Sequence, residues 1–212
     1  MSIVKLNNNG VKNATAFGSI TGLGSLIFIK KITASSSSTV SFVDGASSVV
    51  LDDTYKEYLL TFNNIHPSAN STDFQFNLSV DTGSNYNVAK TSTYFLAYHK
   101  PTNDADYSLG YSAGNDLAQG TGVQILAQNV SDDNEGSMSG HLHLFEPSSA
   151  TFAKHFIATV SYEQKSGGGA IYQVNDYISG YGNTTSACDA IQFSMSSGTI
   201  ATGDICLYGL KI

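Results

Sequence analysis

The sequence predicts an all-β fold, an antiparallel jelly-roll-type β-sandwich of about ten strands with an extended N-terminal arm. Only 13% of the 212 residues are charged, whereas Tyr (12) and Phe (11) are plentiful, and aromatic residues suit the pleated surface of a strand. The chain contains no Arg and few Glu, so the residues that favour long amphipathic helices are scarce. From about residue 38 onward, short strand-like runs alternate with turn signals.

Residues 1–32 are predicted to form an attachment arm and residues 33–212 a single sandwich domain, because no linker-like stretch divides the latter. The first 43 residues hold four Lys and no Asp or Glu, a formal charge of +4, whereas the other 169 residues carry −11. Such an arm is suited to docking on its own domain, on a neighbouring copy or on an acidic partner. The alternative is that residues 1–30 supply an ordinary first strand. The side chains expected to anchor the arm are Lys5, Lys12, Phe17, Phe28, Lys30 and Lys31.

Eleven runs along the body have the length and composition of strands. They cover residues 38–43, 48–52, 56–65, 73–81, 92–100, 122–130, 137–147, 154–164, 170–181, 189–195 and 203–212. Asp44-Gly45 marks a turn after the first run, and His66-Pro67 ends the third, because proline cannot continue a central strand. The fourth run has the clearest two-residue period. Its apolar residues, predicted to share one buried face, are Phe74, Phe76, Leu78 and Val80.

Three segments are less regular. Residues 92–100 fit either a strand or a helical turn. Residues 101–120 are predicted to form a long irregular loop, and loops of that length are often functional. A single helical turn is predicted at 148–154, where Ser149 or Thr151 would cap it.

The sequence offers weak candidates for metal binding and catalysis. His141 and His143 would lie on one face of a strand about 7 Å apart, but no zinc-type spacing accompanies them. The oxygen-rich stretches 103–106 and 132–135 lack the complete calcium-loop pattern and fit ordinary turns. The stretch GYSAG at 110–114 matches G-x-S-x-G, but it falls within the predicted loop and no helix is predicted after it, so it lacks the strand-to-helix turn of a nucleophile elbow. We therefore expect no metal, no cofactor and no catalytic residue, which means that the protein is not an enzyme.

Composition also indicates the state of the two cysteines and argues against nucleic acid and membrane as partners. Cys188 and Cys206 are expected to be two small buried hydrophobic residues rather than a disulfide. The lack of Arg and the net charge of −7 argue against nucleic-acid binding. Residues 16–32 are apolar, but glycines and lysines interrupt them, and they are too short for a membrane span or a good signal peptide. We expect synthesis in a cytoplasm and no membrane insertion.

Carbohydrate binding is a stronger candidate, because sugars stack on aromatic rings and hydrogen-bond to amides and carboxylates. The predicted loop at 101–120 and its flanks bring such side chains together, although the chain has no Trp. The alternative is that the tyrosines only cover the ends of the sandwich. The proposed glycan-binding residues are Tyr98, Asn103, Asp104, Tyr107, Tyr111 and Asn115.

Four stretches stand out as a set across nearly the whole chain. They are MSIVKLNNNGVKNATAFGSI at the start, FVDGASSVVLDDTYKEYLLTFNNIHP at 42–67, HLHLFEPSSATFAKHFIAT at 141–159 and IQFSMSSGTIATGDICLYGLKI at 191–212. Together they resemble a family of virion structural proteins of tailed phages, especially phages of marine bacteria and cyanobacteria. The resemblance implies a β-sandwich of a tail fibre, a tail-associated part or a head decoration, and it carries over no catalytic residue.

The expected function is therefore a non-enzymatic structural component of a phage virion, made in the host cytoplasm and anchored by its arm. The partners would be other virion proteins and copies of the chain itself. A receptor-binding module that recognises a host surface glycan is the alternative, and a glycan depolymerase is a third, weaker one.

Overall fold

The computed structural model describes residues 25–165 and 168–211, which form twelve β-strands and, within those ranges, no helix. The all-β prediction is therefore confirmed for the described residues. The strands are β1 (Leu26–Ser37), β2 (Thr39–Val43), β3 (Glu57–Pro67), β4 (Thr72–Ser79), β5 (Lys90–Lys100), β6 (Asn103–Tyr111), β7 (Gln124–Val130), β8 (Met138–Phe145), β9 (Lys154–Lys165), β10 (Ile171–Gly182), β11 (Ala190–Met195) and β12 (Ile200–Leu210).

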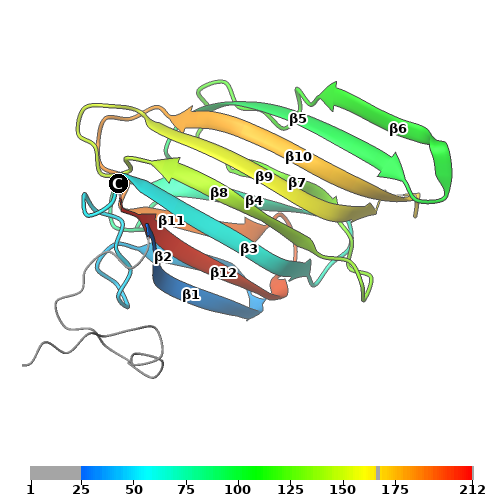
Figure 1. The fold of residues 1–212 in the computed structure, drawn as a ribbon, viewed down its shortest axis with the longest axis horizontal. Coiled ribbons are helices and arrows are strands. Elements are labelled where there is room, and N and C mark those ends of the chain that lie inside the picture. The colour runs from blue at the N-terminus through cyan, green and yellow to red at the C-terminus, as the bar shows by residue number, and fades with distance from the viewer. Residues whose placement is uncertain (1–24, 166–167, 212) are drawn as a thin grey trace, which may run out of the picture.

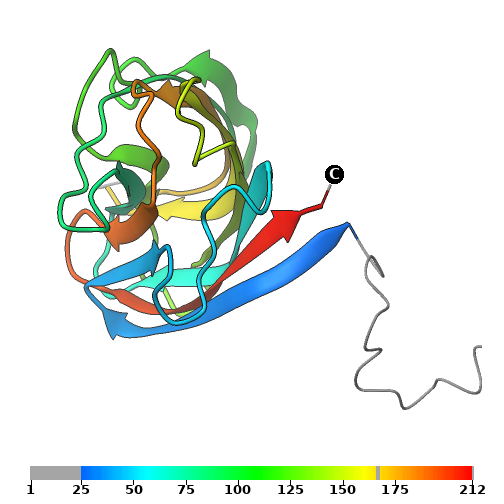
Figure 2. The same cartoon turned by 90° about the vertical axis from the view of Figure 1, so that its left-hand side faces the viewer.

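The strands make one nearly closed antiparallel sheet that folds into two layers (Figures 1 and 2). The larger layer runs β6-β5-β10-β9-β8-β3-β12-β1. The smaller layer, behind it in Figure 1, runs β7-β4-β11-β2. A single residue pair, Val130 with Gln164, joins the layers between β7 and β9. The larger layer thus extends well beyond the smaller one and ends in two edge strands, β1 and β6.

The connectivity is nested like a long hairpin that has been rolled up. β1 pairs with β12 and β3 with β8 in the larger layer, while β2 pairs with β11 and β4 with β7 in the smaller one. Two further hairpins are inserted into this pattern. The β5–β6 hairpin falls between β4 and β7, and the β9–β10 hairpin falls between β8 and β11. These four strands build the part of the larger layer beyond β8.

The core lies between the layers and is rich in phenylalanine. Phe74 and Phe193 of the smaller layer stack with centroids 5.7 Å apart, and Phe62 of the larger layer meets each of them edge-on at 5.3 Å. The alternation predicted for β4 is confirmed at Phe74, Phe76 and Leu78, which are buried. Val80 lies beyond the end of that strand and is 38% exposed.

Two predictions about local structure are wrong. Residues 48–52 form no strand, because Gly45, Ser47 and Ser48 have positive φ and turn the chain there. Asp44 Oδ1 accepts a hydrogen bond of 2.8 Å from the Leu51 amide and closes this turn. No helical turn forms at 148–154, although the Ser149 hydroxyl accepts from the amides of Thr151 and Phe152 as a cap would.

The predicted loop at 101–120 contains a strand, which is a third correction. β6 turns back after Pro101 and pairs along β5, with Tyr107 opposite His99 and Tyr111 opposite Phe95. Only the residues after Tyr111 run without regular structure up to β7. Residues 92–100, whose sequence fits either a strand or a helical turn, belong to β5.

The predicted arm boundary at residue 32 falls inside a strand. β1 starts at Leu26, and residues 26–32 pair with β12, so this part of the predicted arm belongs to the sheet. The alternative of an ordinary first strand therefore holds for these residues. Ile29 and Ile32 pack against the core, which explains why this stretch joins the sandwich. Residues 1–24 lie outside the described residues.

Gly140 of β8 is required by the close approach of β9. A Cβ at this position would lie 2.7 Å from the Val160 Cα and would also overlap the Thr159 carbonyl oxygen. Both are backbone atoms of a paired strand, so the two strands would have to separate. We expect Gly140→Ala to lower the free energy of unfolding, measured in urea, by about 2 kcal/mol or more.

Gly110→Ala on β6 is the matched control, because a Cβ there would meet no atom within 4 Å. It should leave the free energy of unfolding within about 0.5 kcal/mol of the original chain. Equal losses for the two variants would contradict a steric role for Gly140.

Candidate functional site

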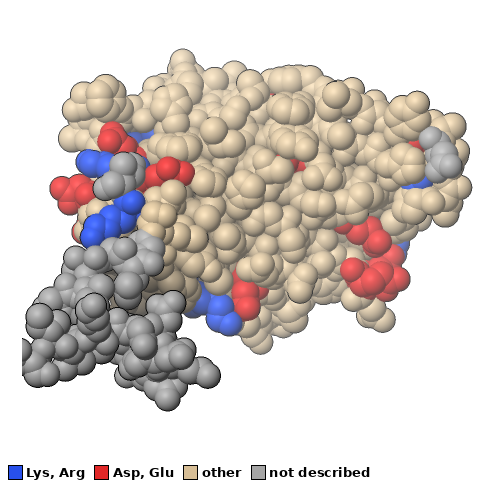
Figure 3. Space-filling view, viewed as in Figure 1, with Lys and Arg blue, Asp and Glu red and all other residues tan. Residues whose placement is uncertain are grey.

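The outward side of the larger layer is an open face with few charges. Because side chains alternate along a strand, every second residue of β9 and β10 is buried, and those between them point outward. Figure 3 shows this face with charged residues gathered toward its ends and a broad uncharged middle. Exposed apolar patches mark interaction sites, and this face carries the exposed side chains of Phe95, Ile157 and Tyr177.

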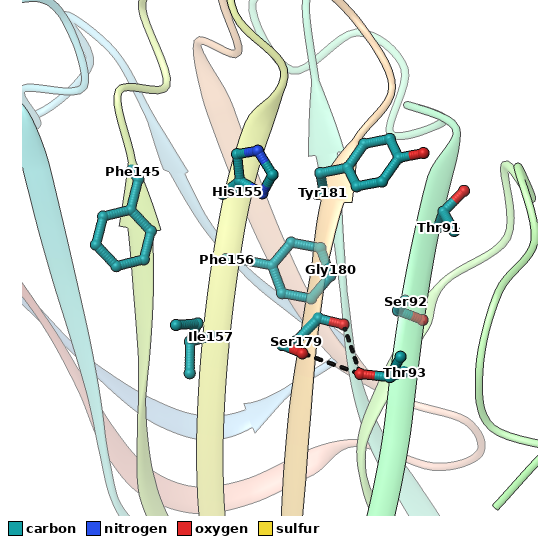
Figure 4. Close-up of a pocket in the computed structure, with 10 residues that line it drawn as sticks. All are labelled: Thr91, Ser92, Thr93, Phe145, His155, Phe156, Ile157, Ser179, Gly180 and Tyr181. Carbon is teal, nitrogen blue, oxygen red and sulfur yellow. Dashed lines mark hydrogen bonds between the residues drawn. The ribbon is translucent and has the colours of Figure 1, made fainter.

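Two adjoining hollows lie on this face, and together we call them the outer-face groove. The first has a volume of about 460 Å³ and the second about 290 Å³, and they share Ile157 and Ser179. β5, β8, β9 and β10 line the first hollow, shown in Figure 4: Thr91, Ser92, Thr93, Phe145, His155, Phe156, Ile157, Ser179, Gly180 and Tyr181. β5, β9 and β10 line the second: Phe95, Ile157, Ala158, Thr159, Tyr177, Ile178 and Ser179.

The rings at the groove are placed by strand register. Antiparallel pairing sets Tyr181 beside His155, with ring centroids 5.8 Å apart, and Phe145 completes this aromatic row from β8 (Figure 4). At the far end of the second hollow, Phe95 and Tyr177 stack with centroids 5.0 Å apart and planes 9° from parallel. The groove therefore has an aromatic wall at each end.

Between the two aromatic walls lies a pair of hydroxyl groups, Thr93 and Ser179, which we call the hydroxyl pair. The Thr93 and Ser179 hydroxyls hydrogen-bond at 2.9 Å, and Thr93 Oγ1 also lies 3.4 Å from the Ser179 carbonyl oxygen. Both residues are exposed, and each hydroxyl keeps acceptor lone pairs for a ligand. Below them, the buried Phe156 ring approaches Gly180, where any Cβ would lie 2.8 Å from it.

The chemistry available at the groove is stacking and neutral hydrogen bonding. The residues that line the two hollows, all of them described by the structure, include no Asp, Glu, Lys or Arg. Glycoside hydrolysis requires a pair of carboxyl groups flanking the bond, and the groove lining does not supply them.

The predicted arm residues are only partly described. Lys5, Lys12 and Phe17 lie outside the described residues, whereas Phe28, Lys30 and Lys31 lie on β1. Phe28 is 58% exposed and meets Tyr208 edge-on at 5.6 Å. Lys31 Nζ lies 3.3 Å from Asp204 Oδ2 on β12, and Asp204 also accepts from the Thr33 hydroxyl at 2.5 Å. On β1 these residues thus make ordinary strand contacts with β12.

The predicted glycan-binding residues do not form one pocket. Tyr107 and Tyr111 point outward from β6 and are 67% and 57% exposed. Tyr98 lies on the opposite side of the sheet, where its ring meets Tyr172 at 5.3 Å. Asn115 is buried and donates to Gln128 Oε1 at 3.2 Å.

The remaining members of that set lie at the start of β6. The Asn103 side-chain oxygen accepts from the Ala105 amide at 3.1 Å, and Asp104 follows it on the strand. The two hollows are lined by none of Tyr98, Asn103, Tyr107, Tyr111 and Asn115, although Tyr111 pairs with Phe95 at the end of the second hollow. Outward aromatic residues spaced four apart, Tyr107 and Tyr111 in β6 and Tyr177 and Tyr181 in β10, were the signal for this face, and turn-forming residues around 101–106 masked it.

His141 and His143 lie on one face of β8, as predicted, with their ring centroids 5.4 Å apart. His143 Nδ1 lies 2.5 Å from Glu57 Oε1 of the neighbouring strand. Burial, followed by the neighbouring His143, lowers the pKa of His141. Within residues 25–165 and 168–211, no group of three or more His, Cys, Asp or Glu side chains is arranged to hold a metal ion.

Several titratable groups are buried. Cys188 and Cys206 are both free and buried, as predicted, and burial raises the pKa of Cys188 to about 12. Burial lowers the pKa of Lys90 to about 8, and its amine donates to Asn77 Oδ1 at 2.5 Å. The Lys154 amine donates to the carbonyls of Ser149 and Phe152. These amines are occupied by internal oxygens and do not reach the groove.

Comparison of the chain with protein-family models, with curated proteins and with solved structures found no match. In the described part of the chain, no helix has the length and apolar character needed to cross a membrane.

Proposed function

We propose that the chain is a non-enzymatic structural component of a phage virion: a tail-fibre, tail-associated or head-decorating protein. The observation that carries the proposal is the nested pairing of β1 with β12, β2 with β11, β3 with β8 and β4 with β7. We interpret this pairing as a jelly roll with two inserted hairpins, and jelly rolls are common among viral capsid and lectin domains. The four stretches that resemble phage virion proteins support the same function.

Attachment is assigned to residues 1–24, with other virion proteins and copies of the chain as partners. These residues precede β1, an edge strand that pairs only with β12. A segment entering at an edge can be held by a neighbouring molecule without opening the sandwich. Lys5 and Lys12 supply positive charge there, opposite in sign to the net charge of −7 on the whole chain.

Deletion of residues 1–24 tests this attachment. The shortened chain keeps all twelve strands, so we expect its thermal unfolding to match that of the full chain. Phage particles assembled with the shortened chain as the only copy should lack it, as measured by quantitative mass spectrometry of purified particles. Undiminished incorporation would contradict attachment through the arm.

Deletion of residues 1–32 is the comparison that separates attachment from folding. It removes the first half of β1, including the Ile29 and Ile32 contacts with the core. This longer deletion should lower the midpoint of thermal unfolding, whereas the deletion of 1–24 should not.

The second candidate function is a receptor-binding module that recognises a glycan on the host surface. The uncharged groove between two aromatic walls favours it. This function is compatible with the first, because the tip of a fibre is both structural and adhesive, and several copies would raise avidity. A glycan depolymerase gains no support from the groove, whose described lining residues include no carboxylate.

A further inference from the structure

We propose that the outer-face groove, rather than the tyrosines of β6, is a binding site for an uncharged glycan. The inference rests on the second candidate function above and names its site and its ligand class. The first hollow, of about 460 Å³, lies in the range of about 300–1,000 Å³ that is usual for ligand pockets.

The lining matches the two faces that a sugar presents. The axial C–H groups of a pyranose ring pack on aromatic rings, which Tyr181 and Phe145 supply at one end and Tyr177 at the other. The hydroxyl groups of the sugar need donors and acceptors at the middle, which Thr93 and Ser179 supply. An alkyl chain would leave this hydroxyl pair without ligand partners, and so a lipid fits the groove less well.

The charge pattern selects an uncharged ligand. No lysine lines either hollow and the sequence contains no arginine, so a carboxylate or sulfate group would find no permanent cation there, and among the lining residues only the His155 imidazole can become charged. The net charge of −7 adds repulsion at a distance. The binding of a neutral glycan involves neither the free-energy cost of desolvating a charge nor this repulsion.

The arrangement of the hollows indicates an extended ligand. The aromatic row, the hydroxyl pair and the Phe95–Tyr177 stack follow one another at every second residue of their strands. Two residues of a strand span roughly 7 Å, which is the scale of one sugar ring. A linear glycan that lies along the strands would thus place one ring in each hollow.

A panel of defined oligosaccharides tests the site. The probes are neutral hexasaccharides of the cello, malto, laminari, xylo and manno series, with oligogalacturonate and heparin fragments as acidic counterparts. Binding is measured on a glycan array with the full-length protein displayed multivalently, and each interaction found is then measured by titration calorimetry. We expect binding to at least one neutral series and none to the acidic probes.

Variants locate the binding. Ser179→Leu fills the space shared by the two hollows, and Tyr181→Ala removes one wall; both residues are on the surface. Each should weaken binding by about tenfold or more. Phe28→Ala is the matched control, because Phe28 is a 58% exposed aromatic residue on β1, at the far edge of the same layer. Its affinity should be unchanged, and thermal unfolding checks that every variant is folded.

Four results would overturn the inference. If neutral glycans bind but only Tyr107→Ala or Tyr111→Ala weakens their binding, the protein recognises glycans but the groove is the wrong site. If only the acidic probes bind, the receptor-binding function stands and the inference of an uncharged ligand fails, whereas if no probe binds, both fail. If the protein self-associates in sedimentation experiments and Ser179→Leu dissociates it, the groove is an interface between copies instead.

Discussion

Replacing Phe193 by alanine is expected to lower the free energy of unfolding by about 4 kcal/mol, the largest effect of any single truncation discussed for this protein. The Phe193 side chain is fully buried on β11. It stacks on Phe74 of its own layer and meets Phe62 of the opposite layer, so its ring connects the two layers. Truncation removes this apolar contact and leaves a cavity that the surrounding strands cannot close.

The measurement is urea unfolding followed by circular dichroism and by tyrosine fluorescence. Tyr107→Ala is the control, because Tyr107 is 67% exposed on edge strand β6. It should change the free energy of unfolding by less than about 0.5 kcal/mol. A loss below about 1 kcal/mol for Phe193→Ala would show that the two layers are not held together by this cluster.

Most strands of this fold were predictable, because the signal for a strand is local. Residues 73–81 alternate apolar and polar side chains, and β4 forms there with its apolar face buried. The order of the strands within each layer could not be predicted from such local signals. The pairing of β1 with β12 joins residues at opposite ends of the described chain, and no local pattern encodes it.

The errors have local physical causes. Residues 49–51 are apolar and contribute Val49 and Leu51 to the core, but the positive φ of Ser47 and Ser48 prevents a strand at 48–52. Residues 101–120 show the opposite error, because a loop was predicted where a strand forms. Pro101 and the Asn and Asp residues that follow signalled a loop, yet they form the turn and first residues of β6.

The middle of the candidate site could not be predicted from sequence patterns, for a related reason. Thr93, Ile157 and Ser179 are far apart in the chain and meet only because β9 and β5 both pair with β10. Threonine, isoleucine and serine on the exposed side of a strand look the same whether or not they line a groove. The predicted tyrosines are close in sequence, whereas the structure places Tyr98 on the opposite side of the sheet from Tyr107 and Tyr111.

One buried carboxyl group makes the stability of the fold depend on pH. Asp176 of β10 is fully buried, and burial raises its pKa to about 7 despite hydrogen bonds from the hydroxyls of Tyr94 and Tyr162. The Tyr94 hydroxyl donates to Asp176 Oδ2, while Oδ1 has no partner among the described residues. A protonated carboxyl group suits this position better than a carboxylate, since no cation is paired with it.

Asp176→Asn is therefore expected to remove a loss of stability that the original chain suffers as the pH rises from 4 to 7. In the unfolded chain Asp176 releases its proton near pH 4, whereas the folded chain keeps it until about pH 7. Between these values the folded state binds more protons, so raising the pH destabilises it, by up to roughly 4 kcal/mol in total. Asparagine is neutral at every pH and keeps an oxygen that accepts from Tyr94.

The free energy of unfolding in urea, measured from pH 4 to pH 8 for both chains, checks this expectation. The advantage of Asp176→Asn should grow across that window and stay constant above it, while the contributions of all other groups cancel in the difference. Asp106→Asn is the control, because Asp106 is partly exposed and lies 3.6 Å from Lys100 at the surface. A difference between Asp176→Asn and the original chain that does not change with pH would show that Asp176 is ionised in the folded protein at pH 4 and above, and that burial does not hold its proton.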